Sequence, residues 1–206
     1  MFALTKPSPQ RIQRFLDESS SLPLSYGPVG LAHSTADPRY CRDRSHVILG
    51  QGSETFNRGW AALQAWRQFD FGWVDIFAAG PPTVVGTNIA VLISHLGFWS
   101  LNGGRILYTL EDDERTHRRG YAYGTLTNHA ERGEEIFEVS MDRATQEVVY
   151  SIHAVSRPRS ALAWCGYPIA RRLQHRFRRD SLAAMQRAAT RHQPNEPLIA
   201  GVRECR

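Results

Sequence analysis

Residues 118–141, which read RRGYAYGTLTNHAERGEEIFEVSM, decide the fold. In an extended chain, the second half of this stretch places three apolar side chains on one face, namely Phe137, Val139 and Met141. An extended pattern also covers 119–127, and only the polar residues 128–133 separate the two segments. Strands joined this closely pair antiparallel, because parallel pairing needs a crossover of about a dozen residues. The stretch therefore predicts a pair of antiparallel strands.

The same extended pattern continues on both sides, from residue 72 to residue 156. Six strands are predicted there, at 73–79, 87–96, 105–112, 119–127, 134–141 and 147–156. Turn-forming residues separate them, including Pro81-Pro82 and Asn102-Gly103-Gly104. A further strand is predicted earlier in the chain, at 45–52. Since every connection among the six is short, the pattern favours an antiparallel meander.

Helical periodicity appears before and after these strands. The segment 53–68 places one stripe of residues on a single face, which we interpret as core: Phe56, Gly59, Trp60, Leu63 and Trp66. A longer helix is predicted at 161–191, with a break or restart at Gly166-Tyr167-Pro168. Its apolar side consists of Ile169, Leu173, Phe177, Ala184 and Ala188. The other side carries His175 and five arginines, Arg171, Arg172, Arg176, Arg178 and Arg179.

The predicted fold class is α+β, with the order strand, helix, six strands, helix. A curved antiparallel sheet of about seven strands has one face to bury, and the C-terminal helix is the element long enough to cover it. This order resembles the helix-grip fold of the birch-pollen-allergen and START-like superfamily. The resemblance implies a cavity between sheet and helix that holds an apolar or amphipathic ligand.

Length and composition support one domain of ordinary globular character. The chain has 206 residues, of which 42% are hydrophobic. We expect a helical extension at 1–23, opened by Ser8-Pro9, a single domain at 24–191, and a loosely ordered tail at 192–206. The three cysteines are far apart and odd in number, which argues against a disulfide scaffold or a zinc ribbon: Cys41, Cys165 and Cys205.

Location and partners follow from charge and hydropathy. Basic residues break every apolar run near the N-terminus, so we expect no signal peptide and a cytoplasmic protein. Residues 76–104 contain no charged side chain, but prolines and glycines interrupt them, and two buried strands explain them better than a membrane span. We expect no cofactor and no metal, and we leave a homo-oligomer open.

Four stretches together resemble one uncharacterised family. They are YGPVGLA at 26–32, GQGSETFNRGWAALQAW at 50–66, YAYGTLTNHAERGEEIF at 121–137, and Ser156-Arg157-Pro158 followed by Gln174. The resemblance covers roughly 24–188 and is to the family labelled domain of unknown function nineteen-ninety. It implies no reaction and supplies no catalytic residues.

The candidate ligand contacts lie on the central strands and at the end of the last strand. Tyr108, Tyr121 and Tyr123 combine an apolar ring with a hydroxyl that needs a partner when buried, so they either line a cavity or fill a core. Ser156 and Arg157 stand at the junction between the sheet and the final helix. Arg157 either pairs with Glu134 or Glu135 or grips an anionic ligand, and we favour the internal pair.

The densest polar cluster is formed by His129, Glu131, Glu134 and Glu135. We favour a solvent-exposed hairpin in which Gly133 adopts a positive φ and the acids pair with arginines. A second interpretation is ligand contact through His129 and Glu134. A third is a metal site, or a hydrolase- or lyase-like enzyme that uses His129 with Glu131 or Glu134.

The arginines of the final helix allow one more interpretation. The run 171–179, with a net charge of +5 for the chain, is compatible with binding nucleic acid or an anionic membrane. Acidic runs at 111–114 and 131–138 are equally concentrated, so pairing within the chain or a contact between subunits is the simpler explanation. The leading hypothesis is therefore a binding protein for a small apolar or amphipathic molecule, and we expect neither nucleic acid nor membrane as a partner.

Overall fold

A computed structural model describes residues 2–33, 37–158 and 167–190. Its core element is one antiparallel sheet with the strand order β2-β8-β7-β6-β5-β4-β3, to which the short β1 adds by pairing with β5. The elements are β1 (Phe2–Ala3), α1 (Pro9–Ser19), β2 (Cys41–Gln51), α2 (Gly52–Gln64), the 3₁₀ turn η1 (Arg67–Phe69), β3 (Val74–Ala78), β4 (Asn88–His95), β5 (Phe98–Leu110), β6 (Thr116–Thr125), β7 (Glu131–Asp142), β8 (Glu147–Pro158) and α4 (Tyr167–Thr190).

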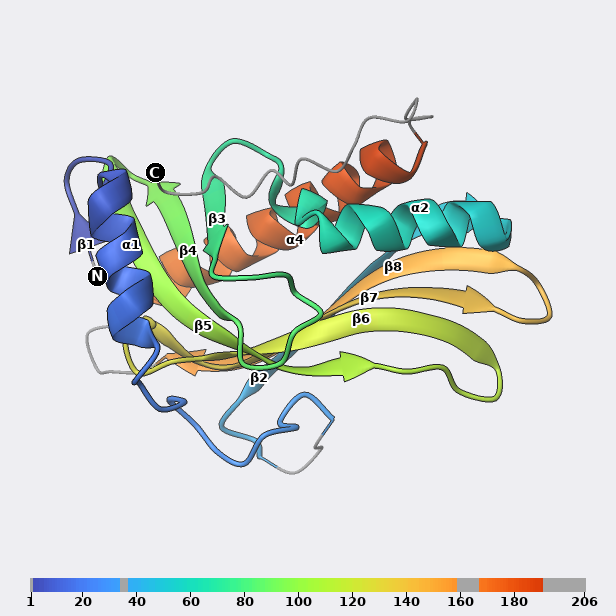
Figure 1. Cartoon of the computed structure of the whole chain (residues 1–206), viewed down its shortest axis with the longest axis horizontal. Helices are drawn as coiled ribbons and strands as arrows, with labels where there is room; N and C mark the ends of the chain where they lie inside the picture. Colours follow the sequence, from blue (N-terminus) through green and yellow to red (C-terminus); the bar gives the residue numbers. More distant parts are fainter. Residues whose placement is uncertain (1, 34–36, 159–166, 191–206) are drawn as a thin grey trace.

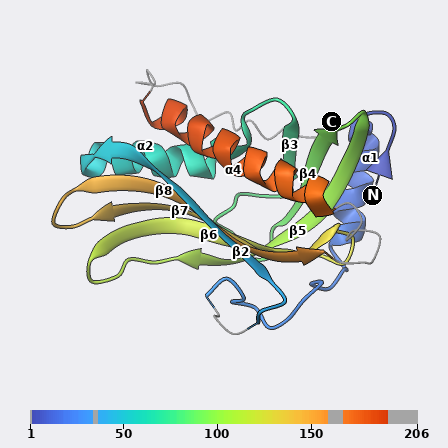
Figure 2. The same cartoon turned by 180° about the vertical axis from the view of Figure 1, so that it is seen from behind.

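The predicted fold class is confirmed. The strands β3 to β8 form the antiparallel meander, and β2 closes the sheet beside β8. The sheet is curved, and α4 runs across one face with α2 beside it (Figures 1 and 2). The tail 192–206 and the first part of the predicted helix, 161–166, lie outside the described residues.

The two faces of the sheet bury different clusters. On the face covered by α2 and α4, Phe56 and Leu63 of the predicted stripe are buried in the main core and Trp60 is partly buried. The helix predicted at 53–68 ends at Gln64; Trp66 has a left-handed backbone conformation before η1 and is also buried in this core. On the other face, α1 inserts Ile12, Phe15 and Leu16 against β3, β4 and β5. Ser8 caps α1 by accepting a hydrogen bond from the backbone N–H of Arg11, as the Ser8-Pro9 pair predicts.

One predicted turn is wrong. Asn102-Gly103-Gly104 lies inside β5, and the turn before it falls at Leu96 and Gly97, both with positive φ. The glycines serve close packing: a Cβ on Gly103 would lie 2.2 Å from Asn128 Oδ1, and one on Gly104 would lie 2.9 Å from the ring of Tyr123. Glycine in a strand is typical of such close approach as well as of a turn, and periodicity does not separate the two cases.

The predicted exposed hairpin at the polar cluster is also wrong. Residues Glu131 to Glu135 are the beginning of β7, and Glu134 is only 2% exposed. Gly133 is not among the glycines with positive φ; a Cβ there would lie 2.0 Å from the Val155 carbonyl oxygen of β8. Two elements from distant parts of the sequence cover this segment, the 26–32 stretch on one face and α4 on the other. Local sequence carries no signal for that covering.

A cavity between the sheet and the C-terminal helix

A cavity of about 590 Å³ lies between the sheet and α4. Most of its wall is apolar and comes from η1, the two short strands β3 and β4, and α4: Phe69, Val74, Val91, Ile93, Leu173 and Phe177. Trp73 completes this wall; its indole N–H donates to Asp180 of α4 at 2.9 Å, and Arg176 stacks over its ring. A void of this size is typical of small-molecule sites in proteins.

The polar part of the cavity wall centres on Glu135. Its side chain projects from β7 towards α4, and the Tyr123 hydroxyl of β6 donates to its Oε2 at 2.7 Å. Burial raises the pKa of Glu135 to about 7, although the hydrogen bond from Tyr123 and the charge of Arg178 act in the opposite direction. Near neutral pH this carboxyl is therefore poised to gain or lose a proton.

Glu131 lies four residues away on the same strand and on the same face. The side-chain amide of Gln174 donates to both of its oxygens, at 2.7 and 2.8 Å, and also to Ser156 Oγ at 3.3 Å. Burial raises the pKa of Glu131 as well, against the hydrogen bonds from Gln174 and Ser156. This contact connects β7, β8 and α4 next to the cavity.

An ion cluster fastens α4 to the edge strand β2. Arg171 donates to both oxygens of Asp43, at 2.5 and 2.9 Å, and Arg178 Nη1 lies 3.1 Å from Asp43 Oδ2. The Arg178 side chain is only 7% exposed, so its charge is held in a largely dehydrated setting. The cluster fixes how far α4 stands from the sheet, and so the width of the cavity at this end.

Glu134 adjoins the cavity through its place on β7, but its carboxylate lies on the opposite face of the sheet. The hydroxyls of Tyr26 and Tyr108 donate to it at 2.7 and 2.6 Å. The backbone N–H groups of 30–32 donate to the same carboxylate at 3.0 to 3.3 Å. Five donors saturate a carboxylate, which offers about four lone-pair sites. Burial and Glu134 together raise the pKa of both tyrosines.

The predicted site residues therefore divide into two groups. Tyr123, His129 and Ser156 line the cavity, and Glu134 borders it. Tyr108, Tyr121 and Arg157 are not part of its wall, because Tyr108 faces Glu134 and Tyr121 is fully buried in the core against Gln68. The nitrogen Nδ1 of His129 accepts the backbone N–H of Glu131 at 2.9 Å.

The favoured pair between Arg157 and Glu134 or Glu135 is wrong. Arg157 lies over the ring of Tyr40 at 4.8 Å, and no ion pair to either glutamate occurs among the described residues. Successive residues of a strand face opposite sides, so Arg157 stands on the outer face while Ser156 faces α4. Its place on the outer face directs Arg157 away from the cavity, and the donors around Glu134 leave no room for a guanidinium.

Sequence reasoning overlooked Glu135, Asp43 and Gln174 as cavity residues. Glu135 stands inside the polar cluster, but the choice between Glu134 and Glu135 depends on which face of β7 meets α4. The apolar side chains Phe137, Val139 and Met141 give that signal, since all three belong to the main core under the helices. Glu135 lies on the same face of the strand as these three residues, and Glu134 lies on the opposite face.

Four of the five arginines in the predicted basic run of α4 are paired within the molecule. Besides Arg171 and Arg178 on Asp43, both Arg176 and Arg179 pair with Asp180. This agrees with internal pairing as the simpler explanation of the basic run. Among the described residues, no group of three His, Cys, Asp or Glu side chains has the arrangement of a metal site.

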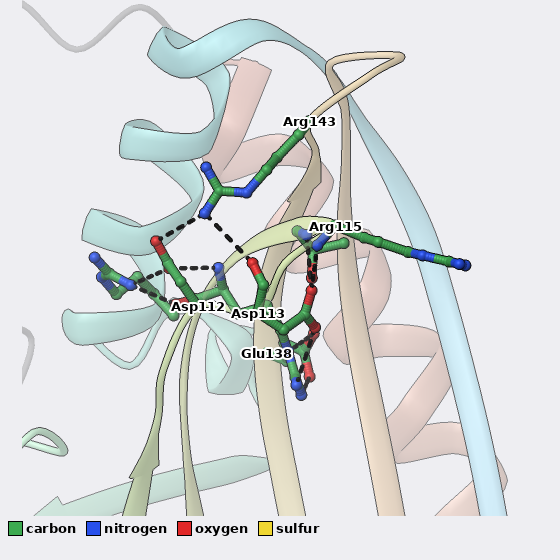
Figure 3. Close-up of polar contacts among 8 residues, drawn as sticks. Asp112, Asp113, Arg115, Glu138 and Arg143 are labelled. Atoms are coloured by element: carbon green, nitrogen blue, oxygen red, sulfur yellow. Dashed lines mark hydrogen bonds and ion pairs between the residues drawn. The ribbon is translucent and has the colours of Figure 1, made fainter.

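A second charge cluster lies at the far end of the long strands, where two turns meet (Figure 3). The Asp112 carboxylate accepts from the backbone N–H of Arg118 at 2.9 Å and contacts His117, Arg119 and Arg143. These bonds, the backbone N–H first, hold the pKa of Asp112 well below its usual range. Arg118 pairs with Glu138 at 2.8 Å. Asp112 and Asp113 of the acidic run 111–114 are thus paired internally.

No helix in the described part of the chain is both long enough and apolar enough to cross a membrane.

Comparisons with known proteins find similar sequences that carry the name UPF0548. A UPF0548 protein of Dictyostelium discoideum is 32% identical over 211 residues, which cover 94% of this chain and 98% of that protein. A UPF0548 protein of Deinococcus radiodurans is 29% identical over 201 residues, 92% of this chain and 99% of that protein.

Solved structures with a similar arrangement include two plant proteins. Major latex-like protein 151 from Panax ginseng matches with a TM-score of 0.46 and 9% identity, over 74% of this chain and 99% of its own. Norcoclaurine synthase from Thalictrum flavum matches with a TM-score of 0.44 and 13% identity, over 85% of this chain and 99% of its own.

A family model described as "Domain of unknown function (DUF1990)" matches residues 25–184. This span includes all four stretches that carry the resemblance in the sequence. The chain belongs to this family of unknown function.

Proposed function

We propose that this protein binds a small, mainly apolar molecule in the cavity between the sheet and α4. The observation that carries the proposal is the cavity of about 590 Å³, with an apolar wall and a few polar groups at one side. Protein interiors are normally close-packed, and the apolar side chains that line a cavity of this size lack part of the van der Waals contacts that fully packed side chains make. A bound apolar molecule would restore those contacts.

The surroundings of the cavity support a binding role. Its wall is built on strands and on a helix that ion pairs and hydrogen bonds hold in place, which favours a preformed site. The few polar groups, among them Tyr123, Glu135 and Ser156, would orient the molecule. An enzyme that uses His129 with Glu134 is less well supported, because the Glu134 carboxylate is saturated by donors on the other face.

Filling the cavity tests the proposal. Val91 is 6% exposed and lines the cavity, so Val91→Phe should occupy part of the space. We expect the affinity for the apolar fluorophore N-phenyl-1-naphthylamine to fall at least tenfold, as measured by fluorescence titration. The matched control is Val84→Phe at a 53% exposed site, which should bind as the wild type does. Equal affinity for both variants, or no binding by the wild type, would contradict the proposal.

Native mass spectrometry of the purified protein supplies an independent measurement. A retained small molecule, lost in Val91→Phe and kept in Val84→Phe, would support the cavity as its site.

A further inference from the structure

We propose that the ligand of the cavity is an amphipathic amine, whose protonated nitrogen is held by the carboxylate of Glu135 and whose apolar part fills the rest of the space. This inference rests on the proposed function and names the chemical class that the polar wall would select.

The first argument is a count of charges at the polar wall. Three acidic side chains face α4 here, Asp43, Glu131 and Glu135, against two guanidinium groups, Arg171 and Arg178. Both guanidinium groups pair with Asp43. In the described part of the chain, neither glutamate has an ion-pair partner. A buried carboxylate is costly unless a cation pairs with it, so the described part of this wall is short of one positive charge.

The second argument is the hydrogen-bonding state of the two glutamates. Gln174 occupies both oxygens of Glu131. Glu135 receives one side-chain hydrogen bond, from Tyr123 to Oε2, in the residues that the structure describes. A carboxylate accepts about four hydrogen bonds, and its neighbour Glu134 receives five. Glu135 therefore has acceptor capacity that faces the cavity.

The third argument is that an ammonium group supplies both the missing positive charge and the missing hydrogen-bond donors at Glu135. A primary ammonium supplies one positive charge and three donors, and such charge-assisted hydrogen bonds are about twice as strong as neutral ones. The rings of Phe69, Tyr123 and Phe177 lie in the same wall and favour both an apolar body and a nearby cation. An anionic head would meet two glutamates here.

The charged and titratable groups around Glu135 also set the pH dependence of binding. Those that act on it come from β6, β7, β2 and α4: Tyr123, Glu131, Asp43 and Arg178. Because burial raises the pKa of Glu135 to about 7, a proton competes with the amine on the acidic side of neutrality. An alkylammonium keeps its charge up to about pH 10. Amine affinity should therefore fall at least threefold between pH 8 and pH 6.

The experiment compares three probes with the same eight-carbon chain, octylamine, 1-octanol and octanoate, by calorimetric titration at pH 8. We expect octylamine to bind at least tenfold more tightly than octanol, and octanoate most weakly. Glu135→Gln, which is nearly isosteric, should abolish the advantage of octylamine over octanol and leave octanol affinity within about twofold. The matched control is Glu138→Gln on the same strand, whose side chain pairs with Arg118 on the other face; it should behave as the wild type does.

The outcomes separate this inference from the proposed function. If none of the three probes binds, the cavity is not an apolar binding site and both proposals fail. If octanol binds as tightly as octylamine, or if Glu135→Gln keeps the preference, only the amine assignment fails. A loss of preference in Glu131→Gln with none in Glu135→Gln would also overturn it. The pH series on the wild type needs no variant, and an affinity that is flat from pH 6 to pH 8 would contradict the role of Glu135.

Discussion

Glu134 and Glu135 are adjacent on β7, yet the two faces of the sheet give their carboxyls opposite surroundings. On the outer face, the 26–32 segment and Tyr108 surround Glu134 with five donors. On the inner face, Glu135 has one hydrogen bond, from Tyr123, and borders a cavity. Burial alone therefore does not give a carboxyl its role. The number of hydrogen-bond donors around the carboxyl separates a structural group from one that is available to a ligand.

The carboxyls at the far end of the sheet differ from those at the cavity in the direction of their pKa shifts. Asp112, Asp113 and Asp142 have lowered pKa values because backbone and side-chain donors in tight turns stabilise their charged forms. Glu131 and Glu135 have raised pKa values because burial dominates. The two glutamates whose pKa is raised by burial thus both lie at the cavity end of the molecule.

The largest effect on stability should come from replacing Glu134 on the outer face of the sheet. Glu134→Gln replaces an acceptor oxygen by an NH₂ group that faces donors, so buried N–H and O–H groups lose their partner. We expect the free energy of unfolding to fall by about 3 kcal/mol or more. Urea denaturation measures it, with Glu138→Gln as the control from the same strand. A loss similar to that of the control would mean that the donors around Glu134 are not needed for stability.

Glu135→Gln should have the opposite effect on stability at alkaline pH. Because the pKa of Glu135 is raised to about 7 from the ordinary glutamate value of 4.5, folding favours its protonated form. The group therefore costs nothing below about pH 4.5, and stability is lost as the pH rises towards 7. The variant escapes this loss, so it should be more stable than the wild type by up to about 3 kcal/mol at pH 8 and nearly equal at pH 4.5.

Urea denaturation of the ligand-free proteins at the two pH values checks this prediction. A difference between variant and wild type that is the same at both values would refute it, because the titration of Glu135 would then not contribute.

A smaller effect is expected at the contact between α4 and β2. Asp43→Asn removes the charge that faces Arg171 and the largely buried Arg178, and we expect a loss of about 2 kcal/mol in unfolding free energy. Hydrogen exchange should show faster opening of α4 than of α2 relative to the wild type. Unchanged exchange in α4 would show that this cluster does not hold the helix on the sheet.

The smallest effect belongs to the far end of the sheet. Arg118→Ala breaks the partly exposed pair with Glu138, and exposed ion pairs contribute roughly 1 kcal/mol or less. We expect a small fall in melting temperature that shrinks further in high salt, because salt screens exposed charges. A loss as large as that of Glu134→Gln would place this end among the main determinants of stability.

The sequence predicted the fold because its signals are local. Alternation in β7, with Phe137, Val139 and Met141 on one face, is a property of an extended chain and needs no tertiary information. The same reasoning failed at Gly103 and Gly104, where close approach to Asn128 and Tyr123 explains the glycines. Of the seven candidate ligand contacts, three line the cavity from the inner face of the sheet: Tyr123, His129 and Ser156.

Local sequence patterns were enough to predict the meander, the covering helix and a dense acidic cluster on the strand β7. They could not predict which acid the 26–32 segment binds, which acid faces α4, or that Arg157 stacks on Tyr40 instead of pairing with either. The physical reason is that strand periodicity is set by neighbours along the chain. Hydrogen-bond saturation and pKa depend on donors and charges from distant segments, some of them 108 and 128 residues away in the sequence.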